Sequence, residues 1–236
     1  MKKKTKNIIG SGFLASQFKK YDKIIKKLNV CIYVAGVSNS LCNNQRELDR
    51  DFNRIRKFSK SINEKKLIYI STCSIFDPNR RASRYIKNKL KIENFIKKRF
   101  YNYTIVRYPE LIGTCKNKNT LMNFFFNNIL SSTKFSAYVN AKRNLLDVKD
   151  ALSLTFYFLK KKKFKEINIA NIEYYNVLFI IRNIENILKI PAVYLVKKNI
   201  YSNWKIKNHV NNNILRILKI KFNKKYLSKA INKYFT

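Results

Sequence analysis

The sequence predicts an α/β fold, in which a doubly wound parallel sheet is covered by helices on both faces and followed by a smaller C-terminal lobe. Short apolar runs alternate with longer amphipathic segments, as in repeated strand–helix–strand units. The apolar runs are unbroken, which is typical of strands covered on both faces. The first run ends in Asn7-Ile-Ile-Gly-Ser-Gly-Phe-Leu-Ala-Ser16, so two of the four glycines of the chain form one Gly-x-Gly turn.

The N-terminal half supplies most of the predicted sheet. We expect strands over residues 6–9, 29–35, 66–71 and 103–108. Helices are expected between them, over residues 13–20, 44–61 and 83–100, with a basic amphipathic connection over 22–28 and a turn at Asp77-Pro78-Asn79. The second helix is the clearest, because Leu48, Phe52, Ile55 and Phe58 recur at spacings of three and four.

The C-terminal half is predicted to contain more helix than strand. Helices are expected over residues 120–130, 148–159, 175–188 and 224–235, and short strands over 166–170 and 193–196. Asp147 is placed to begin the helix at 148, and Pro191 follows the end of the helix at 188. We expect residues 1–160 to form the sheet domain and residues 161–236 the smaller lobe, which also takes in 111–140.

Composition narrows the class of protein. At 236 residues and 46% apolar content the chain is large enough to bury a core, and no segment approaches the ~18 uncharged apolar residues of a membrane span. The four cysteines form no CxxC pair and His209 is the sole histidine, so we expect no metal site. The lysines at the N-terminus precede no signal-peptide core, because the turn at Gly10 intervenes. A reducing, cytoplasmic location fits best.

The charge is extreme, with 51 basic residues against 13 acidic ones and a net charge of +38. One interpretation is an electrostatic footprint for a polyanion. The other is compositional drift, because Lys, Asn, Ile, Tyr and Phe are abundant and the lysines are spread along the chain. Both predict non-specific attraction to polyanions that falls as salt rises, and neither requires a specific nucleic-acid partner.

The Gly-x-Gly turn is typical of a site for the phosphates of a dinucleotide. Gly10 would allow the tight turn, and Gly12 would let the backbone approach a pyrophosphate with no Cβ in the way. Backbone N–H groups at the start of the following helix would hold the phosphates. The predicted cofactor site therefore includes Ser11, Phe13 and Leu14.

A second pattern, Tyr85-Ile-Lys-Asn-Lys89, begins the helix expected at 83–100. The spacing puts the Tyr85 phenol and the Lys89 ammonium on one helix face, one turn apart. A free tyrosine has a pKa of about 10, and a neighbouring ammonium lowers it, which makes the phenol a usable acid or base for hydroxyl–carbonyl chemistry. Thr72, just past a predicted strand, is placed to hold the same substrate oxygen.

In this order the segments resemble the extended short-chain dehydrogenase/reductase family, the NAD(P)-dependent epimerases, dehydratases and reductases of nucleotide sugars. The resemblance covers about residues 7–190. The matching segments are residues 8–16, 34–37, 67–76, 85–93, 104–113, 143–150 and 167–170. It implies a Rossmann-like fold, a C-terminal lobe that encloses a nucleotide-sugar, and a setting in surface-polysaccharide or related sugar metabolism.

The resemblance also implies roles for single residues. Thr72, Tyr85 and Lys89 would be catalytic. Tyr85 and Lys89 would also contact the cofactor, and Lys89 would grip the nicotinamide ribose. Further cofactor contacts would come from Ala35, Gly36, Val37, Ser71, Tyr108 and Pro109. Substrate contacts would come from Ser38, Cys73, Ser74, Glu110 and Arg143, of which Arg143 would contact the diphosphate. Two copies of the chain could pair.

The chain departs from the family pattern in two places. The stretch from Thr72 to Tyr85 is shorter than usual, which trims the loop on the substrate side. Only a short connection joins the first helix to the strand at 29–35, where the family has a further strand, helix and strand. The missing piece carries the acidic residue that binds the adenosine ribose, and Asp22 is a possible substitute. Lys19, Lys20, Lys26 and Lys27 lie nearby in sequence and slightly favour NADP over NAD, or are generic surface.

Several alternatives remain at this stage. Arg107 could pair with Glu110 as a structural link, and Cys73 is expected to be a packed side chain rather than a nucleophile. Ser38 could cap the following helix instead of contacting a ligand. A shortened enzyme could still work, or the chain could be an inactive relic that binds nucleotide, RNA or an anionic surface.

Overall fold

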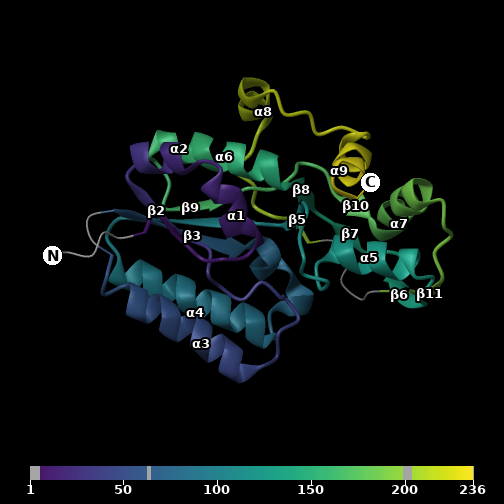
Figure 1. Ribbon diagram of the computed structural model, residues 1–236, viewed down its shortest axis with the longest axis horizontal. Coiled ribbons are helices and arrows are strands. Elements are labelled where there is room, and N and C mark those ends of the chain that lie inside the picture. The colour runs from purple at the N-terminus through teal and green to yellow at the C-terminus, as the bar shows by residue number, and fades with distance from the viewer. Residues whose placement is uncertain (1–5, 63–64, 199–203, 236) are drawn as a thin grey trace. The chain divides into compact units, whose positions relative to one another are not determined.

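The computed structural model describes residues 6–62, 65–198 and 204–235 (Figure 1). The chain divides into two compact units, each of which is described by itself. Unit 1 comprises Met1–Tyr108 and Thr155–Asn168, and unit 2 comprises Pro109–Leu154 and Ile169–Thr236. Residues 155–168 return to unit 1 because they supply the last strand of its sheet, so these ranges differ from the division expected at residue 160.

Unit 1 is built on a five-stranded parallel sheet, which confirms the predicted fold class. The strands are β1 (Ile8–Ile9), β2 (Val30–Tyr33), β3 (Lys66–Thr72), β4 (Tyr103–Tyr108) and β9 (Glu166–Asn168), in the spatial order β1-β2-β3-β4-β9. The helices are α1 (Phe13–Lys19), α2 (Asp22–Lys27), α3 (Gln45–Phe58), α4 (Arg84–Arg99) and the end of α6 (Val148–Lys161). Two short 3-10 turns, η1 (Cys73–Phe76) and η2 (Pro78–Arg80), link β3 to α4.

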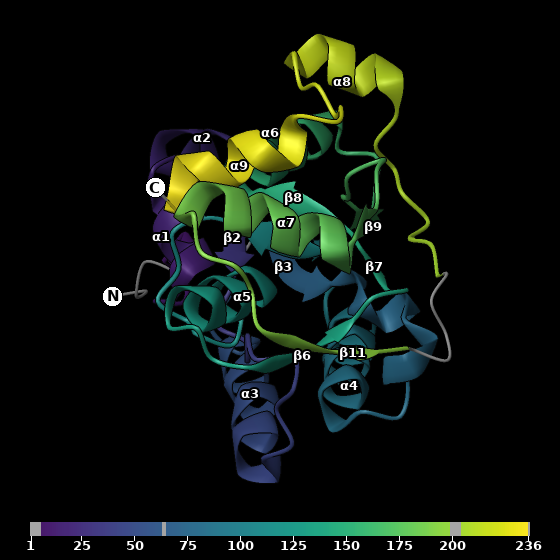
Figure 2. The same ribbon diagram turned by 90° about the vertical axis from the view of Figure 1, so that its right-hand side faces the viewer.

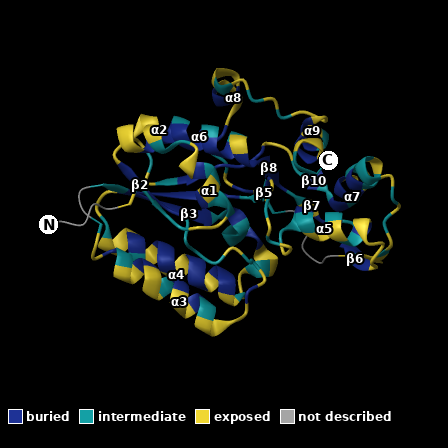
Figure 3. Cartoon of the chain, in the orientation of Figure 1, coloured by how far each residue is buried: buried dark blue, intermediate teal, exposed yellow. Residues whose placement is uncertain are grey.

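Helices cover both faces of this sheet (Figures 1 and 2). On one face α1 and α2 meet the end of α6, where Phe156 packs against Phe18 and Tyr21. On the other face α3 packs along α4. The apolar side chains of both layers close over β2, β3 and β4, whose residues are mostly buried (Figure 3).

The shortened connection changes the topology. Of the described strands, β1 pairs with β2 alone and lies at the edge of the sheet. The steps from β1 to β2 and from β2 to β3 run in the same direction, but their helices lie on opposite faces. The two crossovers therefore have opposite hands, although parallel crossovers are nearly always right-handed. We attribute this to the missing strand–helix–strand piece. Helix α1 packs on the same face of the sheet as it would with that piece present, but the strand that would follow it is absent.

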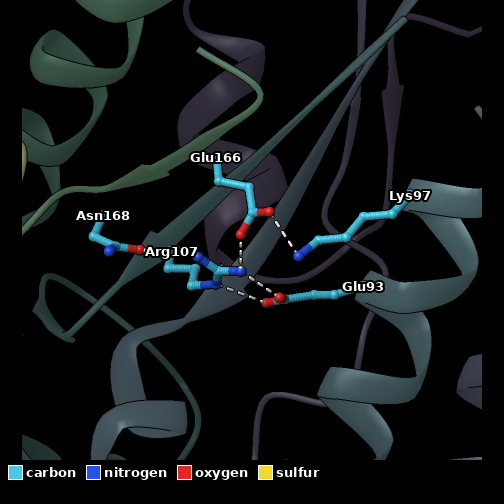
Figure 4. A network of polar contacts seen from close by, with 5 residues as sticks. All are labelled: Glu93, Lys97, Arg107, Glu166 and Asn168. Atoms are coloured by element: carbon cyan, nitrogen blue, oxygen red, sulfur yellow. Dashed lines mark hydrogen bonds and ion pairs between the residues drawn. The ribbon is translucent and has the colours of Figure 1, made fainter. Parts of the chain in front are cut away.

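A buried polar network around Arg107 joins β4 to its neighbouring strand β9 and to helix α4 (Figure 4). Its guanidinium lies 2.5 Å from a Glu93 carboxylate oxygen and 2.6 Å from one of Glu166, and it donates to Asn168. Burial alone would lower the pKa of Arg107. The hydrogen bonds and charges of Glu93 and Glu166 more than offset this and raise the pKa above its usual value, so the group stays charged. The alternative pairing with Glu110 is wrong, because strand β4 directs Arg107 toward α4 and β9.

Unit 2 combines three small two-stranded sheets with helices. The sheets pair β5 (Glu110–Ile112) with β8 (Leu145–Asp147), β6 (Phe135–Tyr138) with β11 (Tyr194–Lys197), and β7 (Lys142–Arg143) with β10 (Tyr175–Asn176). The helices are α5 (Leu121–Leu130), α7 (Val177–Leu188), α8 (Asn212–Leu218), α9 (Tyr226–Phe235) and the start of α6. None of the helices in the described ranges has the length and apolar content needed to cross a membrane.

Candidate functional site

The Gly-x-Gly turn joins β1 to α1 at the carboxyl edge of the parallel strands. Gly10 has φ +140°, and a Cβ built on it would lie 2.8 Å from the backbone oxygen of Val34, so no other residue fits without strain. Gly12 is the N-cap residue of α1 and has no atom within 4 Å of its Cβ position. The space beside Gly12 is therefore open, as a cradle for phosphate requires.

Helix α3 fixes the next loop, which contains Ala35, Gly36 and Val37. Asp51 accepts a hydrogen bond from the Val37 N–H at 3.2 Å, and Arg54 donates to the Ala35 carbonyl at 2.8 Å. Beside the loop lies a pocket of about 220 Å³, lined by residues 35–39 and by Glu47, Arg50, Asp51 and Arg54 of α3. Helix α3 thus holds the loop that the resemblance assigns to the cofactor, and the pocket is lined by both this loop and α3.

Tyr85 and Lys89 lie together on the buried face of α4, as the spacing predicts. The Lys89 Nζ is 5.5 Å from the centre of the Tyr85 ring and 5.8 Å from that of Tyr69. It also lies 3.8 Å from an Asp51 carboxylate oxygen, and a Cβ on Gly36 would come within 2.6 Å of it. Glycine at position 36 therefore makes room for the Lys89 ammonium.

The charge state of Lys89 is well determined by these neighbours. Its side chain is 4% exposed, and Asp51 is 2% exposed. Burial would lower the pKa of Lys89, but Tyr69, Tyr85 and the Asp51 carboxylate together raise it above its usual range. Lys89 is therefore a permanent cation beside the Tyr85 phenol. Burial also raises the pKa of Tyr69, which keeps that second phenol protonated.

The residues at the end of β3 lie next to α4, because η1 packs against that helix. Thr72 accepts a hydrogen bond from the Ser74 N–H at 3.0 Å, which leaves its own hydroxyl proton available to a ligand. Ser71 Oγ is buried and has no hydrogen-bond partner among the residues described. Cys73 is fully buried, and burial raises the pKa of its thiol, so it is a packed side chain and any substrate contact would come from its backbone.

Tyr108 ends β4, and three further predicted residues, Pro109, Glu110 and Arg143, lie in unit 2. Burial raises the pKa of Tyr108, and its hydroxyl bonds to that of Thr155. In unit 2, Pro109 and Glu110 stand at the start of β5, and Arg143 ends β7 opposite Tyr175. The Arg143 Nε is buried without a hydrogen-bond partner in the described structure, and the role of Arg143 stays a prediction.

Asp22 does not lie where the adenosine end of the cofactor is expected, so its suggested role as a substitute ribose ligand is wrong. Asp22 accepts a hydrogen bond from Asn7, which precedes β1, and pairs with Lys26 at 2.5 Å, so it lies at the amino edge of the sheet. Ligands of open α/β sheets bind at the opposite, carboxyl edge. Lys19, Lys20, Lys26 and Lys27 follow the ends of α1 and α2 toward that same amino edge, so they give no reason to prefer NADP over NAD.

Asp51 is the site residue that sequence reasoning missed. A signal was present, because Asp51 falls between Leu48, Phe52 and Ile55 on the apolar face of the helix. A carboxylate on such a face needs a buried partner, and that partner is Lys89. No group of three or more side chains suited to a metal ion occurs in the described ranges.

Comparison with known proteins supports the fold. No protein-family model matches the chain, and no curated protein matches its sequence. Among solved structures, dTDP-4-dehydrorhamnose reductase from Bacillus anthracis with NADP aligns at TM-score 0.70 and 15% identity, covering 97% of each chain. UDP-glucuronic acid 4-epimerase from Bacillus cereus with UDP-glucuronic acid and NAD aligns at TM-score 0.65 and 17% identity, covering 96% of this chain and 87% of that one.

A third enzyme, UDP-N-acetylglucosamine 4-epimerase from Bacillus cereus, aligns at TM-score 0.65 and 18% identity, covering 96% of this chain and 93% of the other. The chain has the fold of these enzymes. The Rossmann-like architecture implied by the resemblance is thereby confirmed. A larger hollow of about 600 Å³ lies in unit 2 between α7 and α9, and none of the predicted site residues lines it.

Proposed function

We propose that this chain is an NAD(P)-dependent enzyme that oxidises and reduces a hydroxyl–carbonyl pair on a nucleotide-sugar. The observation that carries the proposal is the placement of the Tyr85 phenol against a buried, permanently charged Lys89, next to the glycine-bearing loops at the carboxyl edge of the sheet. The three solved structures named above, which share the fold, are two nucleotide-sugar epimerases and a reductase, and two of the three contain NAD or NADP.

The residues present fit a dinucleotide at its phosphates. The open space beside Gly12 and the uncapped N–H groups of the first turn of α1 would receive the pyrophosphate. The loop of Ala35, Gly36 and Val37, held by α3, would contact the rest of the coenzyme. The coenzyme would supply hydride transfer when bound.

The chain's own residues would handle the proton. Tyr85 would donate to or accept from the sugar oxygen, and the Thr72 hydroxyl would orient that oxygen by donating to it. The Lys89 ammonium, 5.5 Å from the centre of the Tyr85 ring, would hold a positive charge beside the reacting group. Because Asp51 lies 3.8 Å from the Lys89 ammonium, the electric field at the reacting group is weaker than that of an unpaired ammonium.

Two glycine variants test the cofactor site. Gly12→Ala should change the free energy of unfolding by about 1 kcal/mol or less, because its Cβ meets no atom, yet weaken coenzyme binding at least about tenfold, because that Cβ fills the phosphate cradle. Gly10→Ala should destabilise the fold itself by about 1–3 kcal/mol, because the residue has φ +140°. Calorimetry with NADH and NADPH measures the first effect, and urea unfolding measures the second.

Tyr85→Phe tests the chemistry separately from binding. It should reduce turnover by ~100-fold or more and change coenzyme affinity far less, because the ring itself is kept. Substrates are found first by thermal unfolding with UDP-, GDP- and dTDP-sugars, because a ligand at 100 times its dissociation constant adds ~2.7 kcal/mol. Coenzyme binding without turnover on any sugar would favour the inactive relic, and equal turnover by wild type and Tyr85→Phe would exclude the phenol from the reaction.

A further inference from the structure

The basic residues of unit 1 are scattered in sequence but gathered in space. In an α/β fold the helices run antiparallel to the parallel strands, so every helix ends at the amino edge of the sheet. Each of the long helices of unit 1 carries basic residues in its last turn, as does α2. They are Lys26 and Lys27 of α2, Arg56 and Lys57 of α3, Lys97, Lys98 and Arg99 of α4, and Lys160 and Lys161 of α6.

Residues that flank the strands extend the same surface. Lys66 begins β3, Lys165 directly precedes β9, and Lys162 and Lys163 follow α6. We refer to these residues and the helix-end residues above as the amino-edge face. It lies at the opposite edge of the sheet from the Gly10 turn, where α2, α4 and α6 end in Figure 1.

Acidic residues do little to neutralise the amino-edge face. Asp22 is paired with Lys26, and Glu166 is held by Lys97 and Arg107. Burial, and then repulsion from Lys162, lower the pKa of Lys66, so like charges already crowd one another there. Attraction of cations to helix ends accounts for one or two lysines per helix, but not for Lys162, Lys163, Lys66 and Lys165.

An aromatic ring stands among these cations. Tyr101, in the loop just before β4, is 95% exposed. The Lys165 Nζ lies 5.8 Å from the centre of its ring and 5.5 Å from that of Tyr103. A ring exposed to this extent beside a cation offers a flat surface on which a nucleobase can stack.

We propose that the amino-edge face binds single-stranded nucleic acid, with its lysines on the phosphates and Tyr101 stacked on a base. The binding needs no sequence preference, because lysines act as point charges and stacking accepts every base. An anionic membrane is the less suitable partner, because a peripheral anchor inserts several apolar side chains and a single tyrosine supplies little such area. The proposal is independent of the nucleotide-sugar chemistry at the carboxyl edge.

Two matched variants test the role of the face. The first carries K160Q, K161Q, K162Q and K163Q, and the control carries K219Q, K221Q, K224Q and K225Q in unit 2. Both sets are four exposed lysines that include one with a positive φ, Lys162 or Lys219, so each removes the same charge at similar positions. Thermal unfolding checks that both variants fold like the wild type.

Affinity is measured by fluorescence anisotropy with a labelled 20-nucleotide oligouridine between 50 and 300 mM KCl. At 150 mM the first variant should bind at least about tenfold more weakly, and its slope of log affinity against log salt should fall by about 2–3, near 0.7 for each lost phosphate contact. The control should lose about threefold or less. Tyr101→Ala should weaken binding about fivefold or more with the salt slope unchanged, and Tyr101→Phe should bind like the wild type.

Three results would overturn the proposal. Equal losses from the two lysine variants would show that the whole charge of the chain acts, with no defined face. No measurable binding by the wild type at 150 mM salt would remove the site altogether. Tighter binding to phosphatidylserine–phosphatidylcholine vesicles than to the oligouridine, abolished by the lysine variant, would assign the face to a membrane.

Discussion

The buried Asp51–Lys89 pair shows how single residues define the candidate site. Asp51 holds the Lys89 ammonium. It also accepts hydrogen bonds from the Val37 N–H, in the loop after β2, and from the Asn88 side chain of α4. One carboxylate therefore connects α3, α4 and the loop after β2. Sequence reasoning found Lys89 by its spacing from Tyr85, but spacing carries no information about a partner that comes from another helix.

A double-mutant cycle on this pair gives a clear prediction. Asp51→Asn and Lys89→Met should each destabilise the fold by about 3–5 kcal/mol, because each leaves a buried charge without its partner. The double variant should cost less than the sum, with a coupling of about 0.5–3 kcal/mol. Urea unfolding of the four proteins measures it.

The control for this cycle is Asp49→Asn, the same change on an exposed position of α3, which should cost about 0.5 kcal/mol or less. Strict additivity of Asp51→Asn and Lys89→Met would mean that the two groups do not interact in the folded protein. It would also remove the reason to regard the Lys89 charge as shared.

At the scale of elements, the periodicity and the unbroken runs of apolar residues in the sequence predicted the long helices and strands well. The helices expected at 44–61, 83–100 and 120–130 are α3, α4 and α5, and the strand expected at 103–108 is β4. Their apolar positions repeat often enough to define a period. The connection expected at 22–28 is the helix α2, and the residues expected to begin the helix at 175 form the strand β10.

The missed elements are short. Strands β5, β6, β7 and β8 have two to four residues each, and α8 has seven. A pair of two-residue strands such as β7 and β10 is defined by its partner across the ladder and not by its own pattern. The sequence therefore predicted unit 1 more completely than unit 2, where all of these strands lie.

The C-terminal helix α9 provides a prediction at this scale. The Tyr226 hydroxyl accepts a hydrogen bond from the Asp147 N–H at 2.9 Å and donates to Asp150 at 2.7 Å, which joins α9 to the start of α6. Tyr226→Phe should destabilise the protein by about 1–3 kcal/mol, because the buried N–H loses its acceptor. Chemical denaturation followed by circular dichroism measures the loss.

Tyr234→Phe on the same helix is the matched control. The Tyr234 hydroxyl donates to the Asp147 carboxylate. After the substitution that carboxylate still accepts hydrogen bonds from Lys233 and from the Lys149 N–H. The cost should therefore be smaller than that of Tyr226→Phe. The reverse order would mean that the Asp147 side chain, and not the Tyr226 bridge, holds α9 in place.

For the whole molecule, charge and topology act together. Drift in composition predicts lysines at every surface position, and the sequence indeed spreads them along the chain. The α/β topology then collects the helix-end lysines of unit 1 at one edge, while Gly10, Gly12, Gly36 and the Tyr85–Lys89 pair lie at the other. The order of elements along the chain does not reveal this separation, because it arises from the antiparallel packing of helices on strands.

A net charge of +38 on 236 residues should make stability depend on salt. The repulsion among like charges destabilises the compact state, and its range falls from about 30 Å at 10 mM salt to about 8 Å at 150 mM. Screening also weakens exposed ion pairs such as Lys26–Asp22, but the 51 basic residues greatly outnumber the 13 acidic ones, and the buried Arg107–Glu93 pair is screened little. We therefore expect the thermal midpoint to rise between 10 and 150 mM KCl, by about 2–4 °C for each kcal/mol of repulsion removed.

Differential scanning calorimetry tests this expectation, with sucrose of equal osmolality as the uncharged control and the K160Q, K161Q, K162Q, K163Q variant expected to show a smaller rise. A midpoint that stays flat or falls as KCl increases would mean that the ion pairs, and not the excess of positive charge, dominate the electrostatics of the fold.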